Sequence, residues 1–218
     1  CIRDRYKGTR KGMPDELREQ VPVIQDVLRA MHVPLVMQKG YEADDLLGTL
    51  ARRAESNNMD VSLVSGDRDL LQLADTHIKI RMPRTSKGTT EIRDYYPEDV
   101  KAEYQVTPIE FIDVKALMGD TSDNIPGVKG IGEKTALTLV QNFGTLEGVY
   151  EHIDDKLIKP KQREHLLECR EMAQLSHTLG TIRTDAPIDT AEGTYAVGEG
   201  NKAEAVRLLQ ELEIHSLI

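Results

Sequence analysis

The chain has 218 residues, of which 30% are charged and 4% aromatic, and it contains no tryptophan. No apolar run approaches the roughly 20 residues that a membrane-spanning helix needs. Two cysteines, Cys1 and Cys169, argue against a disulfide framework and against a cysteine-based zinc site. We therefore expect a helix-rich α/β protein without a membrane partner, in a reducing cytoplasm.

The net charge of −9 argues against a nucleic-acid partner, because domains that bind nucleic acid are usually basic. The charge is unevenly distributed, however, since the first dozen residues carry five cations against the single acid Asp4: Arg3, Arg5, Lys7, Arg10 and Lys11. We expect this segment to be an exposed basic arm that offers cations to phosphates. Residue 1 is cysteine rather than methionine, which indicates a piece of a longer protein.

The pattern of apolar residues predicts alternating strands and helices in the first half of the chain. A helix is expected from about residue 13, with Pro22 as the point of a kink or break. It is followed by a buried strand at 33–37, a helix at 43–57, a strand at 61–64, a short helix at 67–74 and a strand at 78–80. This order is the βαβ signature of a parallel sheet.

The rest of the chain is expected to be mainly helical. Residues 78–94 have the pattern of a β-hairpin around residues 86–89, and Pro97 and Pro108 each open a helix. The expected helices are 97–103, 108–118, 133–143, 146–152, 161–178 and 202–212.

Three clusters of acids stand at places where a strand or helix ends. They are Glu42, Asp44 and Asp45; Asp67 and Asp69; and Asp120 and Asp123. The first two follow consecutive predicted strands, and the carboxyl ends of parallel strands share one edge of the sheet. We therefore expect these clusters to meet on one rim.

Carboxylates gathered on one rim would repel each other unless cations lie between them. Oxygen ligands without cysteine or clustered histidine favour Mg²⁺ or Mn²⁺ over zinc. Two such ions close together are the standard apparatus for phosphodiester hydrolysis. The alternative is structural: acids in a first turn cap a helix and favour its dipole, and the Asp120 cluster would be an ordinary polar loop.

A glycine-rich stretch comes directly after the third acidic cluster. Gly127, Gly130 and Gly132 form a tight hairpin before an amphipathic helix, and Lys129 and Lys134 add positive charge. Backbone N–H groups at such a helix start can hold a phosphate. The pattern resembles the helix-hairpin-helix motif, which grips the DNA backbone without reading its sequence. The alternative is a turn that serves only packing.

Five stretches together resemble the flap endonuclease family, and within it the 5′-nuclease (5′-3′ exonuclease) domains of bacterial DNA polymerase I. They are YKGTR, YEADDLLGTLA, VSGDRDLLQL, MGDTSDNIPGVKGIGEKTA and LLQELEIHSLI, and they span nearly the whole chain. The resemblance implies a PIN-like α/β nuclease core at residues 1–104 and a helical DNA-binding region at 105–218. It implies removal of 5′ flaps and RNA primers with two divalent metal ions.

The resemblance also assigns roles to individual residues. The metal-site acids would be Glu42, Asp44, Asp45, Asp67, Asp69, Asp120 and Asp123. Lys7 and Arg10 would hold the scissile phosphate at the helical clamp. The hairpin would grip the downstream duplex, and in the family it often binds a monovalent cation through backbone carbonyls; its residues are Gly127, Val128, Lys129, Gly130, Ile131, Gly132, Lys134 and Thr135.

The sequence departs from the family pattern at its start. The family has one metal-binding Asp on its first strand and another before the clamp, and neither has a counterpart here. The resemblance therefore implies a core that lacks its first strand and a protein that continues into polymerase domains. Two other functions stay open: a fragment that binds branched DNA without cutting it, and a sugar- or nucleotide-binding protein that uses the acidic rim. The last leaves the hairpin unexplained.

Overall fold

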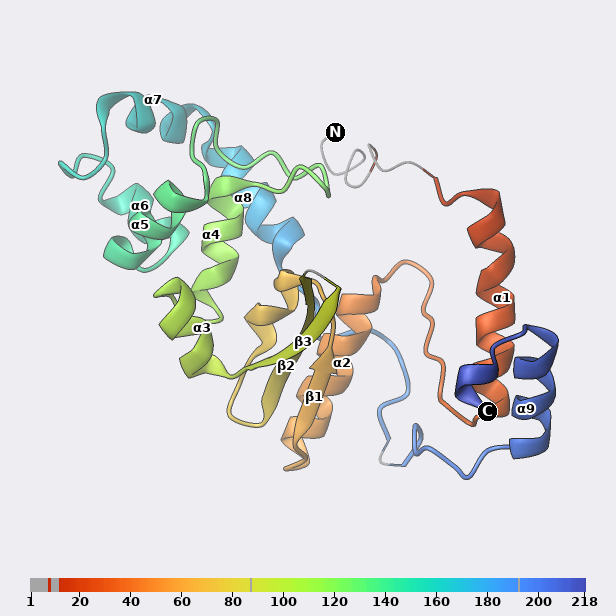
Figure 1. Cartoon of the computed structure of the whole chain (residues 1–218). Helices are drawn as coiled ribbons and strands as arrows, with labels where there is room; N and C mark the ends of the chain where they lie inside the picture. The colour runs from red at the N-terminus through yellow and green to blue at the C-terminus, as the bar shows by residue number, and fades with distance from the viewer. Residues whose placement is uncertain (1–7, 9–11, 87, 192) are drawn as a thin grey trace.

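The computed structural model describes residue 8 and residues 12–86, 88–191 and 193–218. A small sheet lies at the centre with α2 beside it, a group of helices extends to one side, and α1 and α9 stand together on the other (Figure 1). No helix in these ranges is both long and apolar enough to cross a membrane.

The elements follow the expected order with few exceptions. They are α1 (Asp15–Ala30), α2 (Ala43–Ser56), β1 (Val61–Val64), the 3-10 helix η2 (Arg68–Leu73), β2 (Ile78–Ser86), β3 (Thr89–Tyr95), α3 (Pro97–Tyr104), α4 (Glu110–Met118), α5 (Glu133–Phe143), α6 (Leu146–Glu151), α7 (Pro160–Glu168), α8 (Arg170–Gly180), α9 (Lys202–Glu211) and the 3-10 helix η3 (His215–Leu217).

The sheet has the order β1-β2-β3 and is mixed. β1 and β2 pair in parallel, with Val61 opposite Ile78, whereas β2 and β3 are antiparallel, with Ser86 opposite Thr89. The expected parallel pairing of 61–64 with 78–80 is therefore confirmed, and the expected hairpin around 86–89 makes the sheet mixed rather than wholly parallel. Ile78 and Ile80 are fully buried, as the period of two of a half-buried strand requires.

The predicted strand at 33–37 is wrong, because these residues form neither strand nor helix. The segment has the apolar composition of a buried strand, and Val33 and Leu35 are half-buried, but Met37 is 68% exposed. A strand is stable only where its backbone N–H and C=O groups pair with a neighbouring strand. In the described ranges β1 pairs only with β2, and residues 33–37 do not pair with its other edge.

One hydrophobic core joins the sheet to the helices. Leu70 and Leu71 of η2 and Tyr95 of β3 are completely buried, and they belong to the same cluster as Leu117 of α4 and Leu139 of α5. Full burial of each leucine side chain contributes about 1.5–3 kcal/mol. The core therefore fixes the turn after β1 directly against α4.

The helical region packs around α4, which contacts α5, α8 and η2. The single helix expected at 161–178 is wrong, because Cys169 leaves the helical conformation (φ −102°, ψ 16°) and separates α7 from α8. The turn brings Ala173 and Ser176 of α8 into fully buried positions. Packing of α8 on α4 therefore decides where the helix ends.

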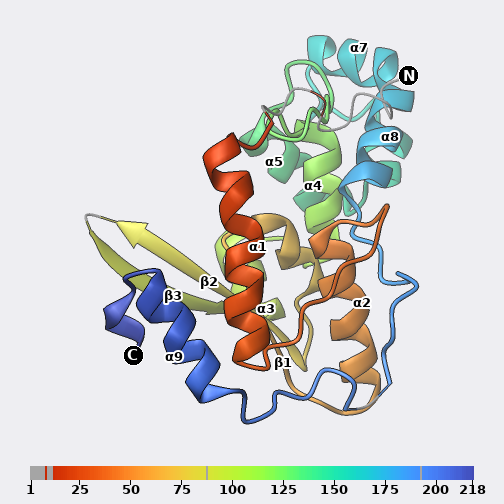
Figure 2. The same cartoon turned by 90° about the vertical axis from the view of Figure 1, so that its right-hand side faces the viewer.

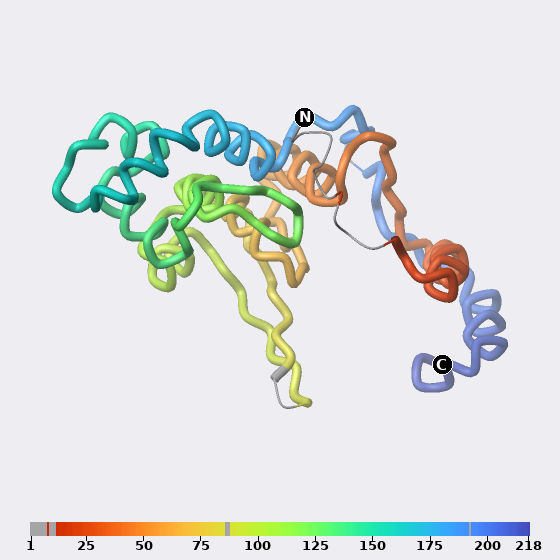
Figure 3. Tube along the Cα trace, turned by 90° about the horizontal axis from the view of Figure 1, so that it is seen from above, coloured from red at the N-terminus to blue at the C-terminus, as the bar shows by residue number. Residues whose placement is uncertain are grey.

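The paired helices α1 and α9 lie side by side in two perpendicular views (Figures 1 and 2). The Asn201 N–H donates to the Ala30 carbonyl at 2.7 Å and ties the end of α1 to the start of α9. The expected break at Pro22 does not occur, since α1 continues through it. Seen from above, this pair and the helices around α7 lie at opposite ends of the molecule (Figure 3).

Candidate metal centre and DNA hairpin

The Asp67 cluster lies on the turn that follows β1. The Asp67 carboxylate accepts a hydrogen bond from the Asp69 N–H at 3.0 Å, and the Asp67 N–H donates to Ser65 Oγ at 3.1 Å. Asp67 is thus the N-cap of η2. The buried Leu70 and Leu71 hold this turn, so both aspartates stay at the carboxyl end of β1.

The Glu42 cluster lies at the start of α2, which packs against β1 and η2. Asp45 Oδ2 accepts from the Glu42 N–H at 3.1 Å, and Asp45 Oδ1 accepts from the Arg183 N–H at 2.9 Å. The Arg183 guanidinium lies 4.6 Å from the centre of the Tyr41 ring. Asp45 therefore caps its helix and also joins it to the chain that leaves α8.

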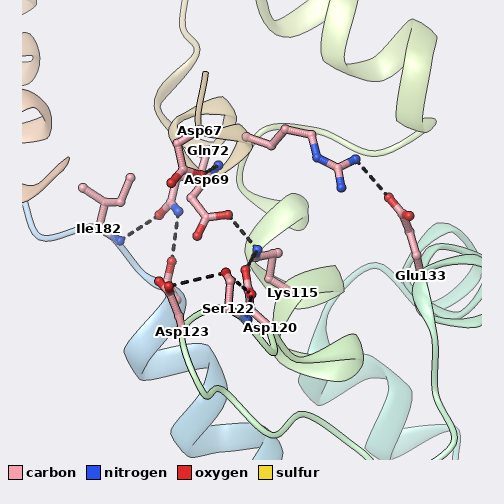
Figure 4. Close-up of polar contacts among 11 residues, drawn as sticks. Asp67, Asp69, Gln72, Lys115, Asp120, Ser122, Asp123, Glu133 and Ile182 are labelled. Carbon is pink, nitrogen blue, oxygen red and sulfur yellow. Dashed lines mark hydrogen bonds and ion pairs between the residues drawn. The ribbon is translucent and has the colours of Figure 1, made fainter. Parts of the chain in front are cut away.

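The third cluster lies on the turn after α4. Asp120 and Ile125 exchange two backbone hydrogen bonds of 2.8 and 2.7 Å. Asp120 Oδ1 accepts from both the N–H and the hydroxyl of Ser122, at 2.8 and 2.6 Å. Asp123 is almost fully buried at 8% exposure. The turn is thus a fixed structure that holds Asp120 toward η2 (Figure 4).

Lys115 connects two of the clusters. Its Nζ lies 2.8 Å from Asp69 Oδ1 and 2.6 Å from Asp120 Oδ2, and its side chain is 12% exposed (Figure 4). Burial raises the pKa of Asp69, an effect that Lys115 only partly offsets. Burial also acts on Asp120, but there the hydrogen bonds from Lys115 and Ser122 prevail and lower the pKa to about 2.

The structure brings all seven predicted acids to two adjoining hollows. A hollow of about 820 Å³ is lined by Glu42, Asp44, Asp45, Asp69 and Asp123. A smaller one of about 370 Å³ is lined by Asp67, Asp69 and Asp120 together with Lys115. Asp69 lines both hollows. The shared rim therefore exists even though residues 33–37 are not a strand, because α2 itself packs beside β1.

The donor set fits a hard divalent ion in its chemistry, since every candidate ligand is a carboxylate oxygen. Among the residues that the structure describes, no three acidic, histidine or cysteine side chains converge closely enough to hold an ion. Several of the acids already have partners within the chain: Asp45 and Asp67 accept from backbone N–H groups, and Lys115 pairs with both Asp69 and Asp120. Binding of an ion there requires side chains to exchange partners.

Sequence reasoning did not identify three residues that line these hollows: Lys115, His177 and Arg183. Lys115 had a local signal, because it stands in the last turn of a predicted helix, five residues before Asp120. His177 and Arg183 lie more than fifty residues beyond Asp123, the last of the predicted metal-site acids. Only the packing of α8 against α4 brings them to the larger hollow.

The predicted hairpin joins α4 to α5. Val128 and Ile131 are buried at 2% and 3% exposure, and the Val128 N–H donates to the Leu117 carbonyl at 2.8 Å. Lys129, Gly130, Gly132 and Lys134 are exposed, and Thr135 is half-buried. The two apolar side chains thus anchor the loop and leave its lysines and the start of α5 facing solvent. The first backbone N–H groups of α5 have no partner within the helix and can meet an anion.

The remaining predicted site residues are Gly127 of the hairpin and Lys7 and Arg10 of the N-terminal segment. Gly127 is buried, and its N–H donates to Ser176 Oγ of α8 at 3.2 Å. Lys7 and Arg10, the predicted phosphate-holding residues, lie outside the residues that the structure describes.

Comparison with known proteins identifies the class to which this fold and these clusters belong. The model of the 5′-3′ exonuclease N-terminal resolvase-like domain matches residues 2–105, and that of the 5′-3′ exonuclease C-terminal SAM fold matches residues 106–203. The chain belongs to the 5′-3′ exonuclease family. The predicted enzyme class is thereby confirmed.

Individual relatives narrow the comparison. The DNA polymerase I of Bacillus caldotenax is 46% identical over 213 residues, which are 98% of this chain and 24% of that protein. The DNA polymerase I of Bacillus subtilis (strain 168) is 42% identical over 213 residues, again 98% of this chain and 24% of that protein. The chain thus spans about a quarter of the length of these relatives, and the predicted resemblance to this group is confirmed.

A solved structure shares the fold as well. The T5 5′-exonuclease with divalent metal ions (zinc) bound aligns with a TM-score of 0.65 and 26% identity, over 98% of this chain and 78% of that one. The similarity of this chain to 5′-exonucleases therefore includes the arrangement of its helices and strands as well as its sequence.

Proposed function

We propose that this chain cuts phosphodiester bonds near the 5′ ends of branched DNA, removing 5′ flaps and RNA primers with two divalent ions, Mg²⁺ or Mn²⁺. The observation that carries the proposal is the meeting of three acidic clusters, from separate parts of the chain, in two hollows that share Asp69. Family membership and the divalent ions bound to the T5 5′-exonuclease support it.

The proposed ligands divide between the two hollows. Glu42, Asp44, Asp45, Asp69 and Asp123 would serve the larger hollow, and Asp67, Asp69 and Asp120 the smaller one. Ions bound there supply an activated water and stabilise charge on the attacking and leaving oxygens. The chain supplies the positioning: the Arg183 N–H orients Asp45, and the Ser122 N–H and hydroxyl orient Asp120.

Two further residues belong to the proposal through the family resemblance. Lys7 and Arg10 would hold the scissile phosphate and stabilise its developing negative charge. Their place in the basic N-terminal segment supports this role, since clustered cations attract a phosphate group.

DNA binding is assigned to the hairpin. Exposed Lys129 and Lys134 flank the turn, and Val128 and Ile131 fix it from beneath. Such a loop would contact phosphates of the downstream duplex and bind a monovalent cation through its carbonyls.

We propose that the chain divides between residues 104 and 105, with a nuclease core before this boundary and a DNA-binding region after it.

The wider context is proposed from the relatives. We propose that the chain works as part of a DNA polymerase I in the cytoplasm, next to polymerase domains, on nicks and flaps left by replication and repair. The T5 flap endonuclease in a pseudo-enzyme-product complex with DNA and metal ions, 26% identical with a TM-score of 0.64 over 97% of this chain and 78% of that one, supports a flap substrate.

The test is cleavage of a labelled 5′-flap duplex with Mg²⁺. Asp67→Asn keeps a side-chain oxygen for the N-cap of η2 while removing its charge, so cleavage should fall by at least about a hundredfold with the fold and DNA binding intact. The matched control is Asp60→Asn, an aspartate 92% exposed that pairs with His77. Undiminished cleavage by Asp67→Asn would remove this residue from the site.

A second function is favoured by one observation: in the described ranges no three candidate ligands converge. The chain would then bind branched DNA without cutting it. Flap binding by the wild-type chain without cleavage at any Mg²⁺ or Mn²⁺ concentration supports this function, and metal-dependent cleavage overturns it.

A further inference from the structure

Lys115 holds a position in the acidic rim that a bound cation would also use. Its Nζ is 2.8 Å from Asp69 Oδ1 and 2.6 Å from Asp120 Oδ2, and Figure 4 shows the ammonium group between the two carboxylates. Mg²⁺ binds carboxylate oxygens at about 2.0–2.1 Å. An ion that binds these two oxygens would therefore replace the ammonium group as their positive partner.

The surroundings leave the ammonium group little freedom. The Lys115 side chain is 12% exposed, and those of Asp69 and Asp120 are 16% and 19% exposed. The other oxygen of Asp120 is occupied by the N–H and hydroxyl of Ser122. Because the turn at 120–125 and the buried η2 are both fixed, the backbone segments that carry the two carboxylates stay close together.

Charge explains why a cation belongs at this point. Asp67 adds further negative potential at Asp69, and burial disfavours the charged form of that carboxylate. Two partly buried carboxylates that face each other without a cation repel each other. Lys115 supplies that cation from the chain itself.

We propose that Lys115 is a positioning residue that holds Asp69 and Asp120 together and competes with a divalent ion for the same two carboxylates. This inference rests on the proposed function, because it takes both aspartates to be metal ligands. The ammonium group thus raises the ion concentration at which the site becomes half-occupied. An ion that binds the two carboxylates would displace the ammonium group toward solvent.

The test compares divalent-ion binding by the 218-residue chain and by Lys115→Met, an unbranched side chain of similar length without charge. Thermal unfolding is followed against Mg²⁺ and, separately, Mn²⁺ concentration, starting from EDTA-treated protein. We expect the variant to unfold at a lower temperature in EDTA. Its half-maximal ion concentration should fall by about 5- to 150-fold, the range of typical coupling between two binding events.

Two controls separate competition from general damage. Lys115→Arg keeps a cation between the carboxylates and should keep the wild-type ion midpoint within about threefold. Lys79→Met removes another partly buried lysine, which pairs with Asp94 on the sheet at 3.2 Å, and should leave the ion midpoint unchanged. If Lys115→Met does not fold, Lys115→Gln is used with the same expectation.

The outcomes distinguish the two proposals. If wild type responds to the ions and the midpoint of Lys115→Met is equal or higher, the competition is overturned while the metal site stands. If neither protein responds at any concentration, the metal site and the competition fail together. If added ions raise the unfolding temperature of Lys115→Met but not that of wild type, Lys115 excludes the ion from the wild-type site, and the competition is supported.

Discussion

Arg68 and Glu133 form an ion pair, with Nη1 and Oε1 3.3 Å apart, that joins the turn after β1 to the first residue of α5. Arg68 stands between Asp67 and Asp69, and Glu133 directly follows Gly132 of the hairpin. Arg68 also interacts with Tyr104 at the end of α3. One side chain thus connects the proposed metal site with the proposed DNA hairpin.

Removal of this link by Arg68→Gln should lower activity more than stability. The two side chains are 46% and 47% exposed, so the pair contributes less than about 1 kcal/mol to folding. A small displacement of the hairpin relative to the acids changes the position of bound DNA, and we expect kcat for flap cleavage to fall up to about tenfold. The measurement is a double-mutant cycle with Glu133→Gln.

The cycle has a clear control. If the ion pair is the reason for the loss, Glu133→Gln alone should resemble Arg68→Gln, and the double variant should be no worse than either. Additive losses would show that Arg68 acts through another contact, such as Tyr104.

The hairpin requires glycine at position 127 for a steric reason. Gly127 has φ +59°, and a Cβ there would lie 2.6 Å from the Met118 carbonyl carbon and against the Gly119 backbone. Gly127→Ala should therefore lower the free energy of unfolding by at least about 2 kcal/mol in urea denaturation. Gly132→Ala is the control, because a Cβ added at Gly132 would have no neighbouring atom within 4 Å. Equal stability of the two variants would contradict the steric argument.

Lysines 129 and 134 should each contribute one phosphate contact. Lys129→Ala and Lys134→Ala are expected to weaken duplex binding about equally for all sequences, and each should reduce the slope of log affinity against log salt by about 1. The measurement is fluorescence anisotropy across a salt series. Lys202→Ala is the control, since α9 lies beside α1 and away from the hairpin (Figure 1). An unchanged slope in both hairpin variants would exclude phosphate contacts from these lysines.

Elements whose determinants are local could be predicted from the sequence. The helix at 43–56 follows from leucines at helical spacing after first-turn acids, and the 78–95 hairpin follows from strand residues around a glycine-containing turn. The hairpin at 127–132 follows from its glycines. In each case the residues that decide the structure are the residues of the element itself.

The features that could not be predicted from the sequence depend on contacts between residues far apart in the chain. Residues 33–37 have a strand composition, but a strand needs a neighbour, and composition does not reveal one. The end of α7 at Cys169 depends on how α8 packs on α4. The pairing of Lys115 with Asp69 bridges forty-six positions, and it could be recognised only once the core had fixed η2 against α4.

Folding stability should carry a pH dependence from His177 and Asp113. His177 Nε2 of α8 lies 3.4 Å from Asp113 Oδ1 of α4, and that buried carboxylate also accepts from the Leu146 N–H at 3.0 Å. The hydrogen bond to Asp113 raises the pKa of His177 above its ordinary value near 6.5, against the opposing effect of burial and with support from Glu147.

The sign follows from the raised pKa. The folded protein holds the His177 proton more tightly than the unfolded chain, so this stabilisation is fully present below about pH 6.5 and is lost as pH rises through the folded pKa. We expect the difference in free energy of unfolding between wild type and His177→Gln to be largest near pH 5.5 and to shrink toward pH 8.5. Urea denaturation across this range measures it. In an Asp113→Asn background the His177→Gln substitution should lose this pH-dependent part, and a difference that grows with pH would contradict the assignment.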